Sequence, residues 1–117
     1  MADDDFRLVY AGISDVGRVR KDNQDSGYAG PHLLVVADGM GGHAAGEVAS
    51  GIVVETMREL VTRGELTSDD VTRQLLVANE RILEGVASHP EQRGMGTTAT
   101  GIVLVTAGGS DHWAVFN

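Results

Sequence analysis

The chain contains no cysteine among its 117 residues. Disulfide bonds, thiolate metal sites and a cysteine nucleophile are therefore excluded, and any catalysis has to use carboxylates, histidine, hydroxyls or a metal ion. Basic residues are also scarce, because nine Lys and Arg stand against seventeen Asp and Glu and give a formal net charge of −8. This charge disfavours nucleic acid or an anionic membrane as the main partner and leaves divalent cations and basic peptides as candidates.

Long apolar runs are missing as well. No stretch of about 18 consecutive apolar residues occurs, so the sequence predicts no transmembrane helix. The N-terminal segment MADDDFRLVYAG carries acidic residues where a signal peptide would be basic, and we therefore expect a cytoplasmic protein. A hydrophobic content of 42% over this length suits one small domain or part of a larger one.

Several segments have the composition of β-strands. Residues 7–14 mix β-branched, aromatic and small residues in a pattern typical of a strand. Residues 33–37 form a short continuous apolar run that favours a strand buried on both faces and ending at Asp38. Residues 94–109 are rich in Thr, Val and Ile and close with the turn Gly108-Gly109. A further strand is predicted to begin at about Ser110.

Two segments have apolar residues at helical spacing. The first predicts a helix from Ala44 to about Thr62, ended by Gly64. The second predicts a helix with Ser68 as its N-cap and acidic residues in its first turn, ending before Pro90.

The stretch VVADGMGGHAAGE, residues 35–47, places Asp38 at the end of an apolar strand and follows it with glycines. A sheet fixes a residue at the end of a strand, while the loop beyond it leaves access for a ligand. Taken alone, an Asp-Gly pair in such a place is more often an ordinary turn.

A second polar cluster, GRVRKDNQDS at residues 17–26, combines a cation with several oxygen ligands. Carboxylate, amide and carbonyl oxygens suit Mg²⁺ or Mn²⁺, and the Arg20 guanidinium has the geometry to bind a phosphoryl group through two hydrogen bonds. By itself, the segment is better explained as a solvated, charged turn.

Three polar, glycine-containing motifs follow one another along the chain. They are GISDVGRVRKDNQDS at 12–26, VVADGMGGHAAGEVAS at 35–50 and GMGTT at 94–98. Jointly they resemble the metal-dependent serine/threonine protein phosphatase family, type 2C, in its bacterial branch, over residues 10–117. The resemblance implies an α+β fold that is part of a four-layer αββα sandwich, with two mainly antiparallel sheets flanked by helix pairs. This chain would supply strands to both sheets and one helix pair.

The resemblance also implies roles for individual residues. Asp38 would bridge two divalent metal ions, Mn²⁺ or Mg²⁺, and the backbone carbonyl of Gly39 would bind one of them. Asp25 would order a metal-bound water, and Arg20 would bind the substrate phosphate. Gln24 stands where some relatives have a Glu that helps to hold a metal, and its neutral amide disfavours direct ligation.

His43 and Glu47 complete the set of candidate residues. Protonation of the leaving alkoxide calls for a general acid. In the eukaryotic branch of the family the histidine proposed for that role directly follows Asp-Gly, where this chain has Met40. His43 therefore stays open as an acid or as a packing residue at the helix start. Glu47 is predicted to interact with the helix dipole or with a ligand of the metal.

The implied reaction is hydrolysis of phosphoserine and phosphothreonine in proteins by a hydroxide that two divalent metals activate, with no covalent intermediate. The partners would be phosphorylated proteins, among them serine/threonine kinases and their substrates. Two other functions remain open. One is a noncatalytic phosphatase-like module that binds phosphoprotein or metal, and the other is an unrelated acidic α/β domain whose glycine loop binds a nucleotide. Asp38 and Arg20 are intact, which favours the enzyme.

We predict that residues 1–117 are the N-terminal part of a single catalytic domain, truncated at the C-terminus. The family continues with a Val-Gly-Asp-Ser-Arg segment and two further aspartates that complete the metal site, whereas this sequence ends at Asn117 within an apolar strand. The 117-residue chain should therefore bind metal weakly and turn over little. The measurement is manganese-dependent hydrolysis of a phosphothreonine peptide by this chain and by a full-length version, and comparable rates would contradict the prediction.

Overall fold

The computed structural model describes residues 24–42 and 44–117. The strand predicted over residues 7–14, together with Arg20 and His43, lies outside the described residues. The elements follow one another as β1 (Asp25–Ala29), β2 (Leu33–Met40), α1 (Ala45–Leu60), α2 (Ser68–Ser88), the short 3₁₀ helix η1 (Pro90–Gln92), β3 (Gly96–Thr97), β4 (Thr100–Ala107) and β5 (Ser110–Phe116).

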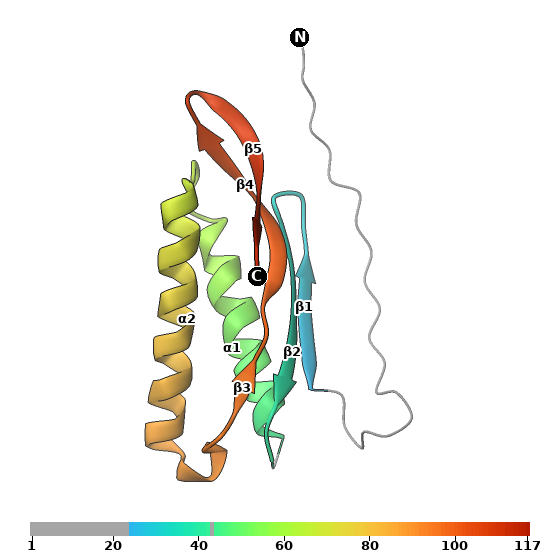
Figure 1. Cartoon of the computed structure of the whole chain (residues 1–117), viewed down its shortest axis with the longest axis vertical. Helices are drawn as coiled ribbons and strands as arrows, with labels where there is room; N and C mark the ends of the chain where they lie inside the picture. The colour runs from blue at the N-terminus through green and yellow to red at the C-terminus, as the bar shows by residue number, and fades with distance from the viewer. Residues whose placement is uncertain (1–23, 43) are drawn as a thin grey trace.

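The described strands form one antiparallel sheet in the order β1-β2-β4-β5, and β3 also pairs with the end of β2. Helices α1 and α2 run side by side along one face of this sheet (Figure 1). An antiparallel sheet with a helix pair on one face matches the predicted α+β class. The prediction that the chain contributes to two sheets is not met by the described strands, since all of them join the same sheet.

Strand β2 alternates between buried and exposed residues along its length. Leu33, Val35 and Ala37 are fully buried toward the helices, whereas Val36 is 55% exposed on the opposite face. The prediction of a strand buried on both faces is therefore wrong for the described part of the chain, because its helices cover a single face of the sheet.

Strand β2 also continues beyond Asp38, where the sequence predicted its end. Its last two residues, Gly39 and Met40, pair with Thr97 and Gly96 of β3. The predicted continuous strand over residues 94–109 is in turn divided into β3 and β4, whereas the turn at Gly108-Gly109 is confirmed. Pairing with a segment about 57 residues away supplied the hydrogen bonds that local sequence patterns could not indicate.

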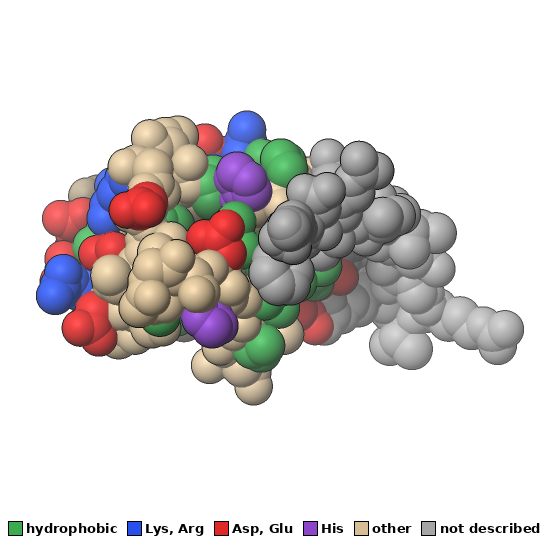
Figure 2. Space-filling view, turned by 90° about the horizontal axis from the view of Figure 1, so that it is seen from above, with side chains coloured by type: hydrophobic (Ala, Val, Ile, Leu, Met, Phe, Trp, Pro, Cys, Tyr) green, Lys and Arg blue, Asp and Glu red, His purple; other side chains and the backbone are tan. Residues whose placement is uncertain are grey.

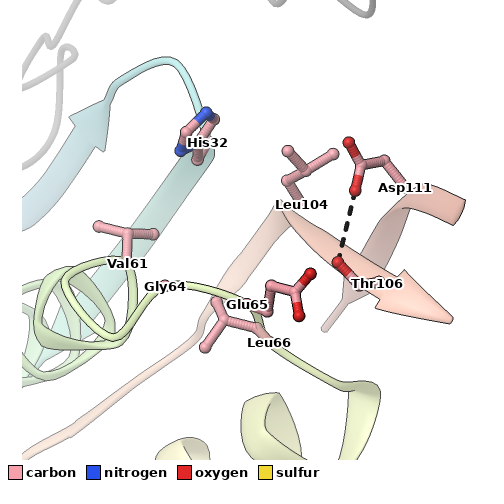
Figure 3. Close-up of a pocket in the computed structure, with 8 residues that line it drawn as sticks. All are labelled: His32, Val61, Gly64, Glu65, Leu66, Leu104, Thr106 and Asp111. Carbon is pink, nitrogen blue, oxygen red and sulfur yellow. Dashed lines mark hydrogen bonds between the residues drawn. The ribbon is translucent and has the colours of Figure 1, made fainter. Parts of the chain in front are cut away.

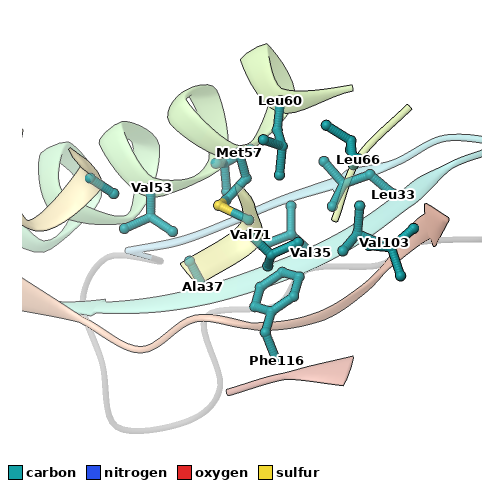
Figure 4. Packing of buried hydrophobic residues seen from close by; sticks show 13 residues of the cluster. Leu33, Val35, Ala37, Val53, Met57, Leu60, Leu66, Val71, Val103 and Phe116 are labelled. Carbon is teal, nitrogen blue, oxygen red and sulfur yellow. The ribbon is translucent and has the colours of Figure 1, made fainter. Parts of the chain in front are cut away.

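The main hydrophobic core lies between the sheet and the helices (Figure 4). Side chains of β2 and β4 meet those of α1 there, and Met57 of α1 is fully buried among them. The 13 buried members of this core are Leu33, Val35, Ala37, Val53, Val54, Met57, Leu60, Leu66, Val71, Ala78, Val103, Val105 and Phe116. A smaller cluster of Ala45, Ala49 and Met95 packs beside the start of α1.

Polar contacts join α1 to α2 beside this core. The buried Gln74 amide donates through Nε2 to the backbone carbonyl of Thr56 at 2.7 Å. Arg81 binds both carboxylate oxygens of Glu59, at 2.7 and 3.1 Å. This hydrogen-bonded pairing lowers the pKa of the Glu59 carboxyl below its usual value. The contacts fix how the two helices align.

Helix α2 starts with a capping box built on Thr67, not on Ser68 as the sequence predicted. The Thr67 N–H donates to the Asp70 carboxylate at 2.8 Å, and the Asp70 N–H donates to the Thr67 hydroxyl at 3.2 Å. Thr67 is the N-cap instead of Ser68 because Asp70, three positions after Thr67, accepts a hydrogen bond from the Thr67 N–H. The bonds from Thr67 also lower the pKa of the Asp70 carboxyl. None of the described helices is long and apolar enough to cross a membrane.

Replacing Thr67 by alanine should destabilise the protein by about 1 kcal/mol, because the first turn of α2 loses its side-chain acceptor. The control is Thr72→Ala, the same substitution at an exposed position inside the same helix, which should be neutral or slightly stabilising. The measurement is the free energy of unfolding in urea at neutral pH. As the pH falls through the lowered pKa of Asp70, protonation of this carboxyl should reduce the difference in unfolding free energy between wild type and Thr67→Ala. An equal effect of the two substitutions would rule out the cap.

Candidate metal and phosphate site

Four chain segments meet at one end of the sheet, where the sequence predicted a site. The start of β1, the end of β2, the start of α1 and strand β3 lie together at the lower end of the molecule in Figure 1. Asp38 and the glycines that follow it are thus surrounded by segments from three distant parts of the sequence.

The two predicted acidic residues stand opposite each other across neighbouring strands. Asp25 of β1 is the register partner of Asp38 of β2. Directly opposed residues of antiparallel strands point to the same face, with Cβ atoms about 4.5–5.5 Å apart. The side chain of Asp38 is exposed, whereas Asp25 is half-buried and its Oδ1 atom is buried. Like charges at such a position repel each other, and a cation between them offsets that repulsion.

Thr98 holds the backbone of Asp38 in place. The Asp38 N–H donates to the Thr98 hydroxyl at 3.0 Å, and the Thr98 N–H donates to the Asp38 carbonyl at 3.0 Å. Thr98 is not among the residues that the sequence singled out for the site. It belongs to the GMGTT motif that the sequence shows, but the pairing of Thr98 with Asp38 depends on the tertiary fold.

Gly39 and Gly46 allow the end of β2 to press against the start of α1. A Cβ added at Gly39 would lie 1.9 Å from the Gly46 carbonyl oxygen and 2.7 Å from the Gln24 carbonyl oxygen. A Cβ added at Gly46 would lie 2.6 Å from the Met40 nitrogen. Any side chain at either position would push the strand away from the helix. Gly39 and Gly46 thus permit close packing of two backbone segments, in addition to the access for a ligand that was expected of the loop after Asp38.

Gln24 lies next to Asp25, but its amide is turned toward the glycine loop. Its Nε2 donates to the Gly41 carbonyl at 3.1 Å. Glu47 is exposed in the first turn of α1, a position that suits a partner of the helix dipole. The predicted roles of Arg20 and His43 fall on residues outside the described part of the chain.

The described residues supply only part of the ligands that a metal ion needs. Within residues 24–42 and 44–117, no three Asp, Glu or His side chains lie together in a way that could hold a metal. The pair Asp25 and Asp38, with the backbone beside Gly39, offers oxygen ligands of the kind that Mg²⁺ and Mn²⁺ prefer. The residues present therefore fit one side of a divalent metal site.

A separate hollow lies at the opposite end of the sheet (Figure 3). It has a volume of about 360 Å³ and an apolar floor that includes Leu66 and Leu104. Its polar rim holds His32, Glu65 and Asp111, and Asp111 accepts a hydrogen bond from the Thr106 hydroxyl at 3.4 Å. In Figure 2, which looks onto this end, acidic side chains are spread among few basic ones, in keeping with the negative charge of the chain.

Comparison with known families agrees with this geometry. The profile of the family described as Protein phosphatase 2C matches residues 14–117, and the chain belongs to that family. The match confirms the resemblance predicted from the three motifs.

Among curated proteins, the chain is similar to the serine/threonine protein phosphatase PstP of Mycobacterium tuberculosis. The two are 46% identical over 100 residues, which cover 83% of this chain and 19% of PstP. The chain therefore spans a small part of that relative's length, in its N-terminal region.

Solved structures show the same fold. A crystal structure of Mycobacterium tuberculosis PstP/Ppp superimposes with a TM-score of 0.79 at 41% identity, over 95% of this chain and 47% of that one. The catalytic domain of PstP in complex with two manganese ions gives a TM-score of 0.73 at 35% identity, over 86% of this chain and 52% of that one. The predicted fold class is confirmed, and the chain spans about half of these domains.

The contact between β2 and α1 can be tested with two glycines of the same helix. Gly46→Ala should destabilise the protein by about 1–3 kcal/mol, because the added Cβ meets backbone atoms that cannot move independently. Gly51→Ala is the control, since nothing lies within 4 Å of a Cβ there, and it should stabilise by about 0.5–1 kcal/mol through helix propensity. Both values come from chemical denaturation. A neutral effect of Gly46→Ala would show that the strand and helix do not approach this closely.

Proposed function

We propose that this chain is part of the catalytic domain of a protein phosphatase that hydrolyses phosphoserine and phosphothreonine in proteins. The observation that carries the proposal is the position of Asp38. It lies opposite Asp25 on the neighbouring strand, and the residue after it, Gly39, has no side chain to cover the backbone. Membership of the Protein phosphatase 2C family and the names of the relatives support it.

Two divalent ions, Mn²⁺ or Mg²⁺, are the proposed cofactors. Asp38 would contact both ions, the Gly39 carbonyl would contact one, and Asp25 would orient water beside them. When bound, such ions neutralise charge on the phosphate and make water a stronger acid at neutral pH. The similarity to a phosphatase structure with two manganese ions supports this assignment.

The chain's own residues would position these groups. One hydrogen bond donated to the Thr98 hydroxyl and one donated by the Thr98 N–H fix the Asp38 backbone, so that the carboxylate is held on the exposed face of the sheet. Arg20 would bind the phosphate through its guanidinium group. The acid that protonates the departing serine or threonine oxygen stays open between His43 and another group.

The proposed partners are phosphorylated proteins, including serine/threonine kinases and their substrates. An acidic surface suits substrates whose phosphorylated segments are flanked by basic residues. The cytoplasmic location expected from the N-terminal segment stays a prediction.

A noncatalytic module that binds phosphoprotein or metal is the second candidate. It is favoured by the small number of metal-ligating side chains that the described part of the chain brings together. The two candidates differ in turnover, since a binding module would hold phosphopeptide without releasing phosphate.

Asp38→Asn should abolish most manganese-dependent phosphatase activity in a protein that continues this chain to a complete domain. The neutral amide removes the charge that offsets repulsion between two cations, and a loss of about 100-fold or more in kcat/KM is expected. Asp111→Asn is the control, because Asp111 is an exposed acid at the far hollow. The measurement is phosphate release from a phosphothreonine peptide at several Mn²⁺ concentrations. If the unmodified complete domain binds the peptide but releases no phosphate, the second candidate holds.

A further inference from the structure

Gln24 occupies the junction between β1, the glycine loop after β2 and the start of α1. Its side-chain Nε2 donates to the Gly41 carbonyl at 3.1 Å, which ties it to a residue 17 positions away. Its Oε1 atom lies against the Cα of Gly46, and a Cβ added at Gly46 would come within 1.9 Å of that oxygen. Both ends of the amide are thus in contact with the backbone around the loop.

The backbone carbonyl of Gln24 makes two more bonds at the same junction. It accepts from the Gly39 N–H at 3.2 Å and from the Ser50 hydroxyl at 2.7 Å. Ser50 is fully buried, and its hydroxyl also lies 2.8 Å from the Ser26 hydroxyl. One residue therefore links the end of β2, the first turns of α1 and the start of β1.

These contacts depend on the side-chain amide of Gln24, which connects two parts of the backbone. A carboxylate at this position has no hydrogen to donate to the Gly41 carbonyl, and two acceptor oxygens would then face each other. Oxygen ligation of a metal would need Oε1 to leave the surface of Gly46. The arrangement favours a side chain that holds the loop over one that binds an ion.

We propose that Gln24 is a positioning residue for the metal site and not a metal ligand. Through Gly41 and the Gly39 N–H, it fixes the backbone that directly follows Asp38 and that includes the Gly39 carbonyl. The consequence for metal binding rests on the proposed function, whereas the effect on the loop does not.

The test uses Gln24→Glu and Gln24→Met in the 117-residue chain without metal and in the complete domain. Methionine keeps the length of the side chain but neither donates to Gly41 nor suits a hard cation. In the metal-free chain, both variants should speed hydrogen exchange of peptides covering residues 38–46 by about fivefold, the effect of one lost hydrogen bond. Unchanged exchange in both variants would overturn the proposal.

In the complete domain, both variants should raise the Mn²⁺ concentration for half-maximal activity by about tenfold, with a smaller change in kcat at saturating Mn²⁺. A metal ligand predicts the opposite for Gln24→Glu, because an added carboxylate would lower the Mn²⁺ concentration required. A lowered requirement would overturn the proposal. If the unmodified domain shows no activity at all, the proposed function fails, and the exchange experiment still decides the role of Gln24.

Gln74→Glu provides a matched control. Gln74 also donates its Nε2 to a backbone carbonyl, that of Thr56 at 2.7 Å, but it does so between α1 and α2. The same chemical change there should affect overall stability while leaving exchange of residues 38–46 and the Mn²⁺ requirement unchanged. Equal effects of Gln24→Glu and Gln74→Glu on both readouts would show that the loss is general destabilisation and would overturn the proposal.

Discussion

The architecture of this site depends on the contact between the backbones of Gly39 and Gly46. Their close approach brings the last residues of β2 against the first turn of α1, and no side chain fits between them. Because β2 alternates between the helix-facing and the open side of the sheet, burial of Gly39 against the helix places Asp38 on the open side. The position of the acidic group thus follows from a steric condition one residue away.

Around this contact, hydrogen bonds from separate segments restrict the same few residues. Thr98 binds both backbone groups of Asp38, and Gln24 binds Gly39 through its carbonyl and Gly41 through its amide. Each bond contributes modestly, but together they leave the loop few alternative conformations. Such order would favour the binding of a charged ligand, because the groups that contact it would not have to reorganise.

Asp25 and Asp38 face each other at one cross-strand position, an arrangement that suits the binding of a cation. Local rules of sheet stability alone would not favour two acids there. The far end of the sheet follows local rules more closely, with hairpin turns, an apolar core and a capped helix.

The sequence alone determined the helices, the turn at Gly108-Gly109 and the membership of the family, and it singled out Asp38 as a candidate site residue. Each helix, turn and motif depends on residues close together in the chain, whose periodicity and spacing can be seen directly. Only the tertiary structure decided that β2 continues past Asp38, that β1 begins at Asp25, and that Gln24 and Thr98 hold the loop. The reason is that these arrangements are made by contacts between segments 17 to 60 residues apart, which no local pattern encodes.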